Sequence, residues 1–146
     1  MIVDWVRLQD FAGTVAMVDG SFDPLHDGHI AYFAKATEFG LPILCNIASD
    51  SWTATKHPVL LPQKIRAIVV DSIRHVDFVH CATVSTQEVL ARAKPAMYLK
   101  GADWLIRGGI PTEEAAICRQ LDIEVRYLDT VLNSSSQLIT RFHQKQ

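Results

Sequence analysis

Two histidines, His26 and His29, stand three residues apart in the stretch GSFDPLHDGHI, which covers residues 20–30. A short apolar run at 14–18 precedes the stretch and apolar residues at helical spacing follow it, so it is predicted to join a buried strand to a helix. The first turn of a helix presents unpaired N–H groups and a positive dipole end, which favour an anion. A phosphate bound there would meet both imidazoles and several backbone amides. The pattern therefore favours a reaction that builds negative charge on phosphorus.

Other readings of this stretch remain open. Gly20 and Gly28 are predicted to let the backbone turn tightly and approach a ligand. Asp23 is placed either in contact with substrate or as a cap of the turn or helix. The two histidines could instead be surface residues or metal ligands, but no third ligand stands at a suitable spacing for zinc. We therefore expect no metal held by protein side chains.

Three later polar segments also follow predicted strands. The segment at 49–57 contains Trp52 and Lys56, the segment at 100–104 contains Asp103 and Trp104, and a run of polar residues covers 133–136. The tryptophans could bind a base or sugar or could anchor their loops, and Lys56 could neutralise a phosphate or remain solvated. The serines would cap a helix whether or not they bind phosphate.

The chain as a whole reads as one ordinary globular domain over residues 1–146. Hydrophobic residues make up 49% and charged residues 21%, and the formal net charge is -2. This balance gives no general attraction to nucleic acid or to an anionic membrane, so we expect neither as a partner. Three cysteines without a C-x-x-C pair favour reduced thiols in a cytoplasmic protein. No signal peptide or membrane span is visible.

Strand and helix patterns alternate along the chain. This order predicts an α/β fold, a Rossmann-like, doubly wound parallel sheet of five strands with helices on both faces. The predicted strands lie at 14–18, 43–48, 77–81, 96–99 and 123–128. A weak amphipathic pattern predicts a leading helix within 2–11, and the other helices are expected at 30–39, 63–75, 86–93, 111–121 and after 136.

The helix at 63–75 has a pattern of its own. Ile65, Ile68, Val69 and Ile73 fall on one face, which predicts a buried apolar stripe with Arg66 outside it. Arg66 would then be either a solvated side chain or a phosphate ligand. In a parallel sheet the loops after the strands meet at one edge, so the four chemistry-bearing segments are expected to form one site at a switch point in strand order.

These residues resemble a known family. Residues 20–29 look like the G-x-F-D-x-x-H-x-G-H signature of the cytidylyltransferase-like nucleotidyltransferases, and SSSQLI at 134–139 resembles their S-[ST]-[ST]-x-x-I motif. Arg66 to Asp77 is similar to their R-x(10)-V-D segment, and KGADW at 100–104 resembles the K-G-G-D-[YW] loop of heptose 1-phosphate adenylyltransferases. The order and spacing match small members of the group over nearly the whole chain.

The resemblance implies in-line attack by a substrate phosphate on the α-phosphorus of a nucleoside triphosphate, with release of pyrophosphate. It implies catalytic roles for His26, His29 and Lys56, with Mg²⁺ carried mainly by the triphosphate. The residues implied or proposed to bind nucleotide are Gly20, Ser21, Phe22, Gly28, His29, Arg66, Lys100, Ser134, Ser135 and Ser136. Those proposed for the phosphorylated acceptor are Asp23, Trp52, Lys56, Asp103 and Trp104.

The resemblance points to ATP and a sugar 1-phosphate, with a heptose 1-phosphate as first choice. The alternative is a CTP-dependent cytidylyltransferase for glycerol 3-phosphate or a similar alcohol phosphate, although this chain lacks the arginine that usually precedes the serine motif there. Two further alternatives are a nucleotide-binding module without turnover and a flavodoxin-like flavin carrier. Small relatives often form homodimers, so a homodimer is also expected.

Overall fold

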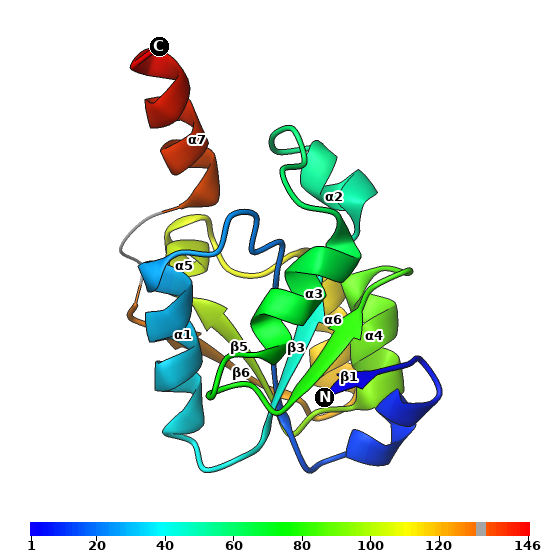
Figure 1. Ribbon diagram of the computed structural model, residues 1–146. Helices are drawn as coiled ribbons and strands as arrows, with labels where there is room; N and C mark the ends of the chain where they lie inside the picture. The colour runs from blue at the N-terminus through cyan, green and yellow to red at the C-terminus, as the bar shows by residue number, and fades with distance from the viewer. Residues whose placement is uncertain (131–133) are drawn as a thin grey trace.

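The computed structural model describes residues 1–130 and 134–146 and contains one parallel sheet (Figure 1). The six strands are arranged in the order β1-β4-β3-β2-β5-β6. Their bounds are β1 (Ile2–Val3), β2 (Ala16–Gly20), β3 (Ile43–Ile47), β4 (Phe78–Cys81), β5 (Met97–Gly101) and β6 (Glu124–Leu128). The helices are the 3-10 helix η1 (Arg7–Phe11), α1 (Asp27–Thr37), α2 (Asp50–Ala54), α3 (Gln63–Asp71), α4 (Thr86–Ala93), α5 (Asp103–Ile106), α6 (Thr112–Gln120) and α7 (Ser135–Gln144).

The predicted Rossmann-like parallel sheet is confirmed, with one strand more than the five expected. The additional strand, β1, is a two-residue edge strand that pairs with β4, too short to leave a pattern in the sequence. The predicted helix over 2–11 is wrong, because this strand and η1 take its place. Helices α2 and α5 are short helices in segments that the sequence analysis treated as loops.

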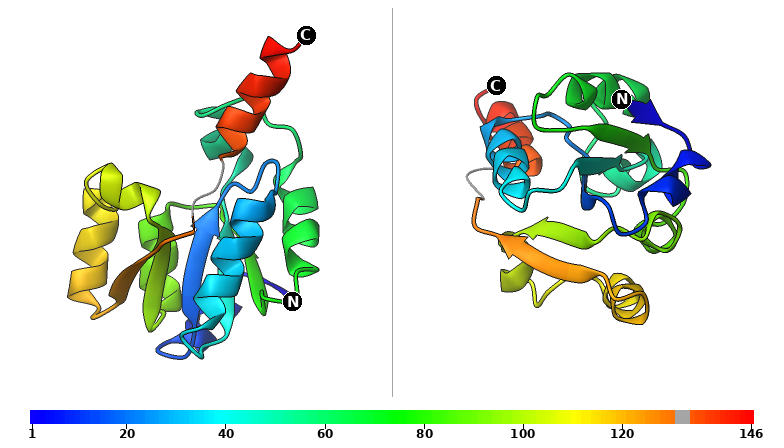
Figure 2. Two further views of the ribbon diagram at one scale, coloured as in Figure 1. Left: turned by 90° about the vertical axis from the view of Figure 1, so that its left-hand side faces the viewer. Right: turned by 90° about the horizontal axis from the view of Figure 1, so that it is seen from below.

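Two layers of helices cover the sheet (Figures 1 and 2). Helices α1 and α3 pack on one face, where Phe33 and Val70 join a buried cluster with alternate strand residues such as Val18. Helices α4 and α6 cover the other face with η1, around the buried Leu90 and Met17. Odd-numbered residues of β2 therefore face α4 and α6, because successive strand side chains point to opposite faces.

Helix α3 packs in a different orientation from the one expected. The apolar stripe predicted to be buried is largely exposed, with Ile65 44%, Ile68 59% and Val69 38% accessible. Arg66, predicted to lie outside, is 1% exposed and is among the largest fully buried side chains of the protein. Burial of the charged residue reflects polar partners from three neighbouring loops, which the helical period cannot reveal.

Strand β2 lies at the switch point of the sheet, with β3 on one side and β5 on the other. It pairs with β3 over five residues, from Ala16 to Gly20, but with β5 only at Ala16 and Met17. Beyond Met17 the two strands separate, and the carbonyl of Leu99 on β5 accepts a hydrogen bond from the hydroxyl of Tyr32 on α1. The separation opens a crevice at the carboxyl edge of the sheet, where ligands of open α/β sheets bind.

Helix α7 extends beyond this edge, on the same side of the molecule as α2 (Figures 1 and 2). The helix has no buried residue, and its first turn is tied to the body by a hydrogen bond from the Ser135 hydroxyl to the carbonyl of Pro24. Asn133, the first residue of the predicted polar run, lies outside the described residues. No helix among the described residues is long and apolar enough to cross a membrane.

Candidate active site

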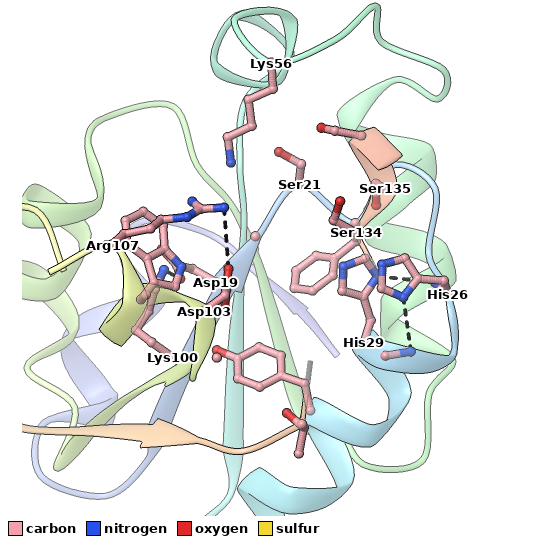
Figure 3. A pocket seen from close by; sticks show the side chains of 18 of the residues that line it. Asp19, Ser21, His26, His29, Lys56, Lys100, Asp103, Arg107, Ser134 and Ser135 are labelled. Atoms are coloured by element: carbon pink, nitrogen blue, oxygen red, sulfur yellow. Dashed lines mark hydrogen bonds and ion pairs between the residues drawn. The ribbon is translucent and has the colours of Figure 1, made fainter. Parts of the chain in front are cut away.

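A cavity of about 420 Å³ occupies the crevice between β2 and β5 (Figure 3). Its size falls in the usual range for small-molecule sites. Four segments that follow strands converge on it, as the sequence analysis predicted. The residues that line it are Asp19, Gly20, Ser21, Phe22, His26, Gly28, His29, Tyr32, Lys56, His57, Lys100, Gly101, Asp103, Trp104, Arg107, Thr130, Ser134, Ser135 and Ser136.

The imidazole rings of His26 and His29 stack against each other at one end of the cavity. Their centroids are 3.7 Å apart with an interplanar angle of 20°. Nδ1 of His26 accepts a hydrogen bond from the backbone N–H of Gly28 at 3.1 Å, and Nδ1 of His29 accepts one from the N–H of His26 at 3.3 Å. These bonds cap the start of α1, so the residues that begin the helix also orient the two rings.

The same bonds define which ring nitrogen carries hydrogen. An Nδ1 that accepts from a backbone N–H has its lone pair occupied, so the proton of each neutral ring is on Nε2. Among the described residues, Nε2 of His26 is the one buried side-chain polar atom that lacks a hydrogen-bond partner. A buried donor without a partner is costly, and a ligand acceptor would satisfy it.

Burial keeps both rings neutral. Burial and, to a smaller extent, the neighbouring His26 together lower the pKa of His29 to about 3, while Asp27 opposes the shift. Burial also lowers the pKa of His26, again against the charge of Asp27. At neutral pH the site thus presents two N–H donors rather than two cations.

The cavity wall beside the histidines combines a loop with the start of α7. Ser21 accepts a hydrogen bond from the hydroxyl of the buried Thr53 on α2 at 2.9 Å, which fixes its position. Ser134 accepts from the N–H of Gln137 and so caps α7. Figure 3 shows the serines close to the histidine pair, so two helix starts border one end of the cavity.

Positive side chains gather at the opposite end of the cavity (Figure 3). Lys100 is nearly buried and pairs with Asp19 at 2.6 Å. Its Nζ lies 4.5 Å from the centroid of the Trp104 ring, and the guanidinium of Arg107 lies 5.0 Å from the same centroid while contacting Asp103 at 3.6 Å. Two cations thus share one aromatic ring.

Lys56 reaches toward this group from above, as Figure 3 shows. Burial lowers the pKa of Lys56, and the charges of Lys100 and Arg107 lower it further, while Asp19 and Asp103 act in the opposite direction. Mutual repulsion among the three cations indicates an excess of positive charge that an anion would relieve. This end of the cavity is therefore suited to a phosphate group.

Asp23 and Arg66 were predicted to contact ligand, but neither lines the cavity. Asp23 is fully buried and accepts hydrogen bonds from the N–H groups of Leu60 and Leu61 at 2.8 and 2.9 Å. Arg66 donates to the carbonyls of Leu61 and Ser21 and to the carboxylate of Asp50. All these groups belong to the protein, so both side chains position the loops around the cavity.

Trp52 was also predicted to contact ligand and also lies outside the cavity. It is 54% exposed, and Nζ of Lys56 lies 5.5 Å from the centroid of its ring. Trp104 lines the cavity, but two cations lie against its ring. We therefore interpret both tryptophans as supports for positive side chains.

Gly20 and Phe22 lie close together where β2 ends and the connection to α1 begins. A Cβ at residue 20 would lie 2.9 Å from the ring of Phe22, so the glycine makes room for that ring. The Phe22 ring is buried and packs edge-on against the His29 ring, with the two ring centroids 4.9 Å apart. Gly20 therefore supports the histidine pair through Phe22, in addition to lining the cavity.

Several lining residues were not predicted from the sequence. Asp19 and Tyr32 belong to the strand and helix on either side of the motif, and Arg107 directly follows the short helix α5. One sequence feature could have predicted Asp19 as a cavity residue, since it is a charged residue at the end of an apolar strand. His57 and Thr130 carried none, because their place at the cavity depends on how their loops fold.

Comparisons with known proteins agree with this geometry. The cytidylyltransferase-like family model matches residues 17–141. The bifunctional protein HldE of Helicobacter pylori strain Shi470 is 32% identical over 132 residues, which cover 87% of this chain and 27% of HldE. HldE of Photobacterium profundum is 35% identical over 95 residues, which cover 62% of this chain and 20% of that protein. The chain thus spans about a quarter of the length of these relatives.

Two solved structures are similar in fold. A lipopolysaccharide core biosynthesis protein from Thermoplasma volcanium has a TM-score of 0.68 at 18% identity, covering 82% of this chain and 98% of that one. Pantothenate synthetase from Thermus thermophilus has a TM-score of 0.65 at 13% identity, covering 99% and 70%. The family match over most of the chain, the HldE similarity and the histidine motif at the switch point agree: this chain belongs to the cytidylyltransferase-like family of nucleotidyltransferases.

Proposed function

We propose that this chain is a single nucleotidyltransferase domain that joins ATP to a sugar 1-phosphate, with a heptose 1-phosphate as first choice, giving an ADP-sugar and pyrophosphate. One observation carries the proposal: two neutral histidine donors face a group of three cations across a single cavity. The sugar phosphate is supported by the resemblance of KGADW at 100–104 to the loop of heptose 1-phosphate adenylyltransferases and by the similarity to HldE, which has a domain of that kind.

The two ends of the cavity suit the two substrates. The triphosphate would bind at the histidine end, with backbone N–H groups near Ser21 and the start of α7 around its phosphates. The phosphate of the acceptor would bind at the other end, near Lys56, Lys100 and Arg107. This arrangement would bring an acceptor oxygen and the α-phosphorus together, which is the main requirement for phosphoryl-type transfer.

In the proposed reaction an oxygen of the sugar phosphate forms a bond to the α-phosphorus. The bond from that phosphorus to the oxygen bridging to the β-phosphate breaks, and pyrophosphate leaves with the bonding electrons. Nε2–H of His26 and of His29 would donate hydrogen bonds to the α-phosphate oxygens and the bridging oxygen as charge develops on them. No proton transfer from the protein is required.

Magnesium is proposed to arrive with the triphosphate. Within residues 1–130 and 134–146 no group of three metal-ligating side chains is found, and the two cavity carboxylates, Asp19 and Asp103, are already paired with cations. The phosphate oxygens themselves would supply the ligands. When bound, the ion would neutralise charge on the phosphates.

The proposal is tested by measuring pyrophosphate release with ATP or CTP against a panel of acceptors that includes heptose 1-phosphates, other sugar 1-phosphates and glycerol 3-phosphate. We expect turnover with ATP and a sugar 1-phosphate. Turnover with CTP alone would identify the cytidylyltransferase alternative and overturn the proposal. Nucleotide binding without any pyrophosphate would favour a binding module, and a yellow protein with bound flavin would favour a carrier.

Substitution of Arg107 tests whether the positive end of the cavity binds the phosphate of the acceptor. Arg107→Ala is expected to raise the KM for the acceptor by roughly tenfold or more, because a charge-assisted contact to phosphate is lost. The matched control is Arg126→Ala on β6, whose exposed side chain pairs with Glu124 away from the cavity. An unchanged KM for the acceptor would remove Arg107 from the binding site.

Sedimentation of the same preparations would test the predicted homodimer.

A further inference from the structure

A network of buried and partly buried polar groups extends from the cavity wall into the protein on the α6 side of the sheet. The hydroxyl of Tyr98 on β5 lies 2.9 Å from Oδ2 of Asp19 and 2.6 Å from Oε1 of Glu114 on α6. The other carboxylate oxygen of Asp19 lies 2.6 Å from Nζ of Lys100. Tyr98 is fully buried, so bulk solvent does not reach its hydroxyl.

The number of hydrogens in this network is too small if both carboxylates are charged. A phenol carries one hydrogen and can donate it to one acceptor, yet the Tyr98 oxygen lies within hydrogen-bond distance of two carboxylate oxygens. The second contact needs a hydrogen from its carboxyl group. Without that hydrogen, two oxygen atoms with facing lone pairs would lie 2.6 to 2.9 Å apart, and the carboxylate would lose its partner.

The additional hydrogen belongs on Glu114. Asp19 is stabilised as an anion by the ammonium of Lys100, whereas Glu114 makes no ion pair among the described residues. The charged and titratable groups around Glu114 are Asp19, Lys100, Tyr98, its helix neighbour Glu113 and Cys118, one turn along α6. Burial and the charge of Asp19 both raise the pKa of Glu114, while Tyr98 and Lys100 act against the shift.

We propose that Glu114 is protonated in the folded protein and donates to Tyr98, which donates to Asp19, so that the Lys100 ammonium is held in place at the acceptor end of the cavity. Glu114 and Tyr98 are then positioning residues that touch no substrate. Glu114 is absent from the cavity lining, as is Tyr98, whereas Asp19 and Lys100 both line it. The expected effect on substrate binding rests on the proposed function, whereas the protonation of Glu114 does not.

The protonated network is electrically balanced, with one carboxylate and one ammonium. Loss of the Glu114 proton at higher pH leaves two carboxylates and one ammonium next to the end of the cavity that is proposed to bind an anion. We therefore expect anionic substrate to bind more weakly as the pH rises through the raised pKa of Glu114. The amide in Glu114→Gln can donate the same hydrogen bond at every pH and should abolish this dependence.

The proton itself can be observed without any substrate. The chain has five glutamates, Glu38, Glu88, Glu113, Glu114 and Glu124, so an NMR titration of protein labelled with 13C at the glutamate carboxyl carbon gives five signals. We expect one signal to titrate above the ordinary glutamate range and to be absent from Glu114→Gln, while Glu113→Gln keeps it. Five signals that all titrate at or below the ordinary range would overturn the proposal, whether or not the protein is an enzyme.

The positioning role is measured by binding of ATP with Mg²⁺ and by the KM for the sugar phosphate, each as a function of pH. The wild type is expected to lose affinity for the sugar phosphate with rising pH, and Glu114→Gln to lose less, because the titration of Lys56 remains in both proteins. Tyr98→Phe is expected to lose roughly tenfold in kcat/KM at neutral pH. The KM should change more than kcat in each case. Equal pH profiles for wild type and Glu114→Gln would overturn the positioning role. ATP binding without turnover would contradict the proposed function and leave the NMR result standing.

Discussion

In each of the stacked histidines, one ring nitrogen makes a structural hydrogen bond and the other is left as a donor. Nδ1 of each ring is used to cap helix α1, which leaves Nε2–H of each available to the cavity. Donors fixed by the backbone need little reorganisation when charge develops on phosphorus. The neutral state also avoids repulsion between two imidazolium rings 3.7 Å apart.

The first prediction follows from this arrangement. His29→Ala should lower turnover by roughly 10²-fold to 10³-fold, the loss typical of one preorganised donor. The variant should still fold, because it loses only one weak capping bond and the ring contacts with His26 and Phe22. Turnover and circular dichroism are measured together, with His143→Ala on the exposed end of α7 as control. Near-normal turnover in folded His29→Ala would exclude a catalytic role for the ring.

The motif residues could be predicted from sequence because the glycines, histidines and serines have distinctive types at fixed spacing. Arg66 and Asp23 could not be assigned in this way, although both lie in matching segments. Their side chains satisfy backbone groups of other loops, and those partners are 5 to 45 residues distant in sequence for Arg66 and 37 or 38 for Asp23. A charged residue in a motif is equally consistent with ligand binding and with loop support until its partners are seen.

At the scale of elements, helix α3 connects three segments that border the site. Its Arg66 binds the carbonyl of Ser21 at 2.6 Å, the carbonyl of Leu61 at 2.9 Å and the carboxylate of Asp50 at 2.6 Å. The three partners are bound by Nε, Nη1 and Nη2, and a lysine, whose three N–H donors share one nitrogen, cannot reach partners spaced around a planar guanidinium. The side chain therefore fixes the loop that carries Ser21 relative to α2.

The second prediction is that Arg66→Lys lowers the free energy of unfolding by about 1–3 kcal/mol, because buried acceptors lose charge-assisted hydrogen bonds. Urea unfolding measures the change, and Arg74→Lys, just after the same helix and exposed, serves as control. Affinity for ATP should also fall, since the Ser21 loop is no longer held. Unchanged stability and affinity would show that the three contacts contribute nothing measurable.

The elements themselves were predicted where hydrophobic periodicity was strong and local caps were present. Helix α4 covers 86–93, as predicted; a capping box of Ser85 and Glu88 begins it, and Lys94 ends it in a left-handed conformation before Pro95. The face of α3 was predicted wrongly because three apolar side chains look like a core stripe from sequence alone. The preference for burying Arg66 arises from tertiary hydrogen bonds, which helical periodicity does not record.

At the scale of the whole molecule, strand order explains why one cavity collects residues from four loops. Strands β2 and β5 are neighbours in space although two strands separate them along the chain, and they pair at only two positions before separating. Alternation of strand and helix was sufficient to predict this edge as the site. The alternation could not predict that Tyr98 and Glu114, on the α6 side of the sheet, form hydrogen bonds behind the cavity wall.

The third prediction concerns the stability of the whole molecule against acid. His29 is neutral in the folded protein down to a pKa of about 3, whereas in the unfolded chain it titrates near 6.5. Between these values the unfolded state binds more protons, so acid favours unfolding. The contribution of His29 to stability is complete above pH 6.5 and is lost as the pH falls toward about 3. Its slope is at most about 1.4 kcal/mol per pH unit.

This contribution is isolated by comparing urea unfolding of the wild type and His29→Gln across the same pH range. The difference between the two removes titrating groups that do not contact His29, including His80, whose pKa burial also lowers, and Glu114, whose raised pKa acts in the opposite direction. We expect the wild type to lose more stability than His29→Gln as the pH is lowered below 6.5. The exposed control His143→Gln should follow the wild type. Parallel curves for wild type and His29→Gln would mean that folding does not lower the pKa of His29, which would contradict a buried neutral ring.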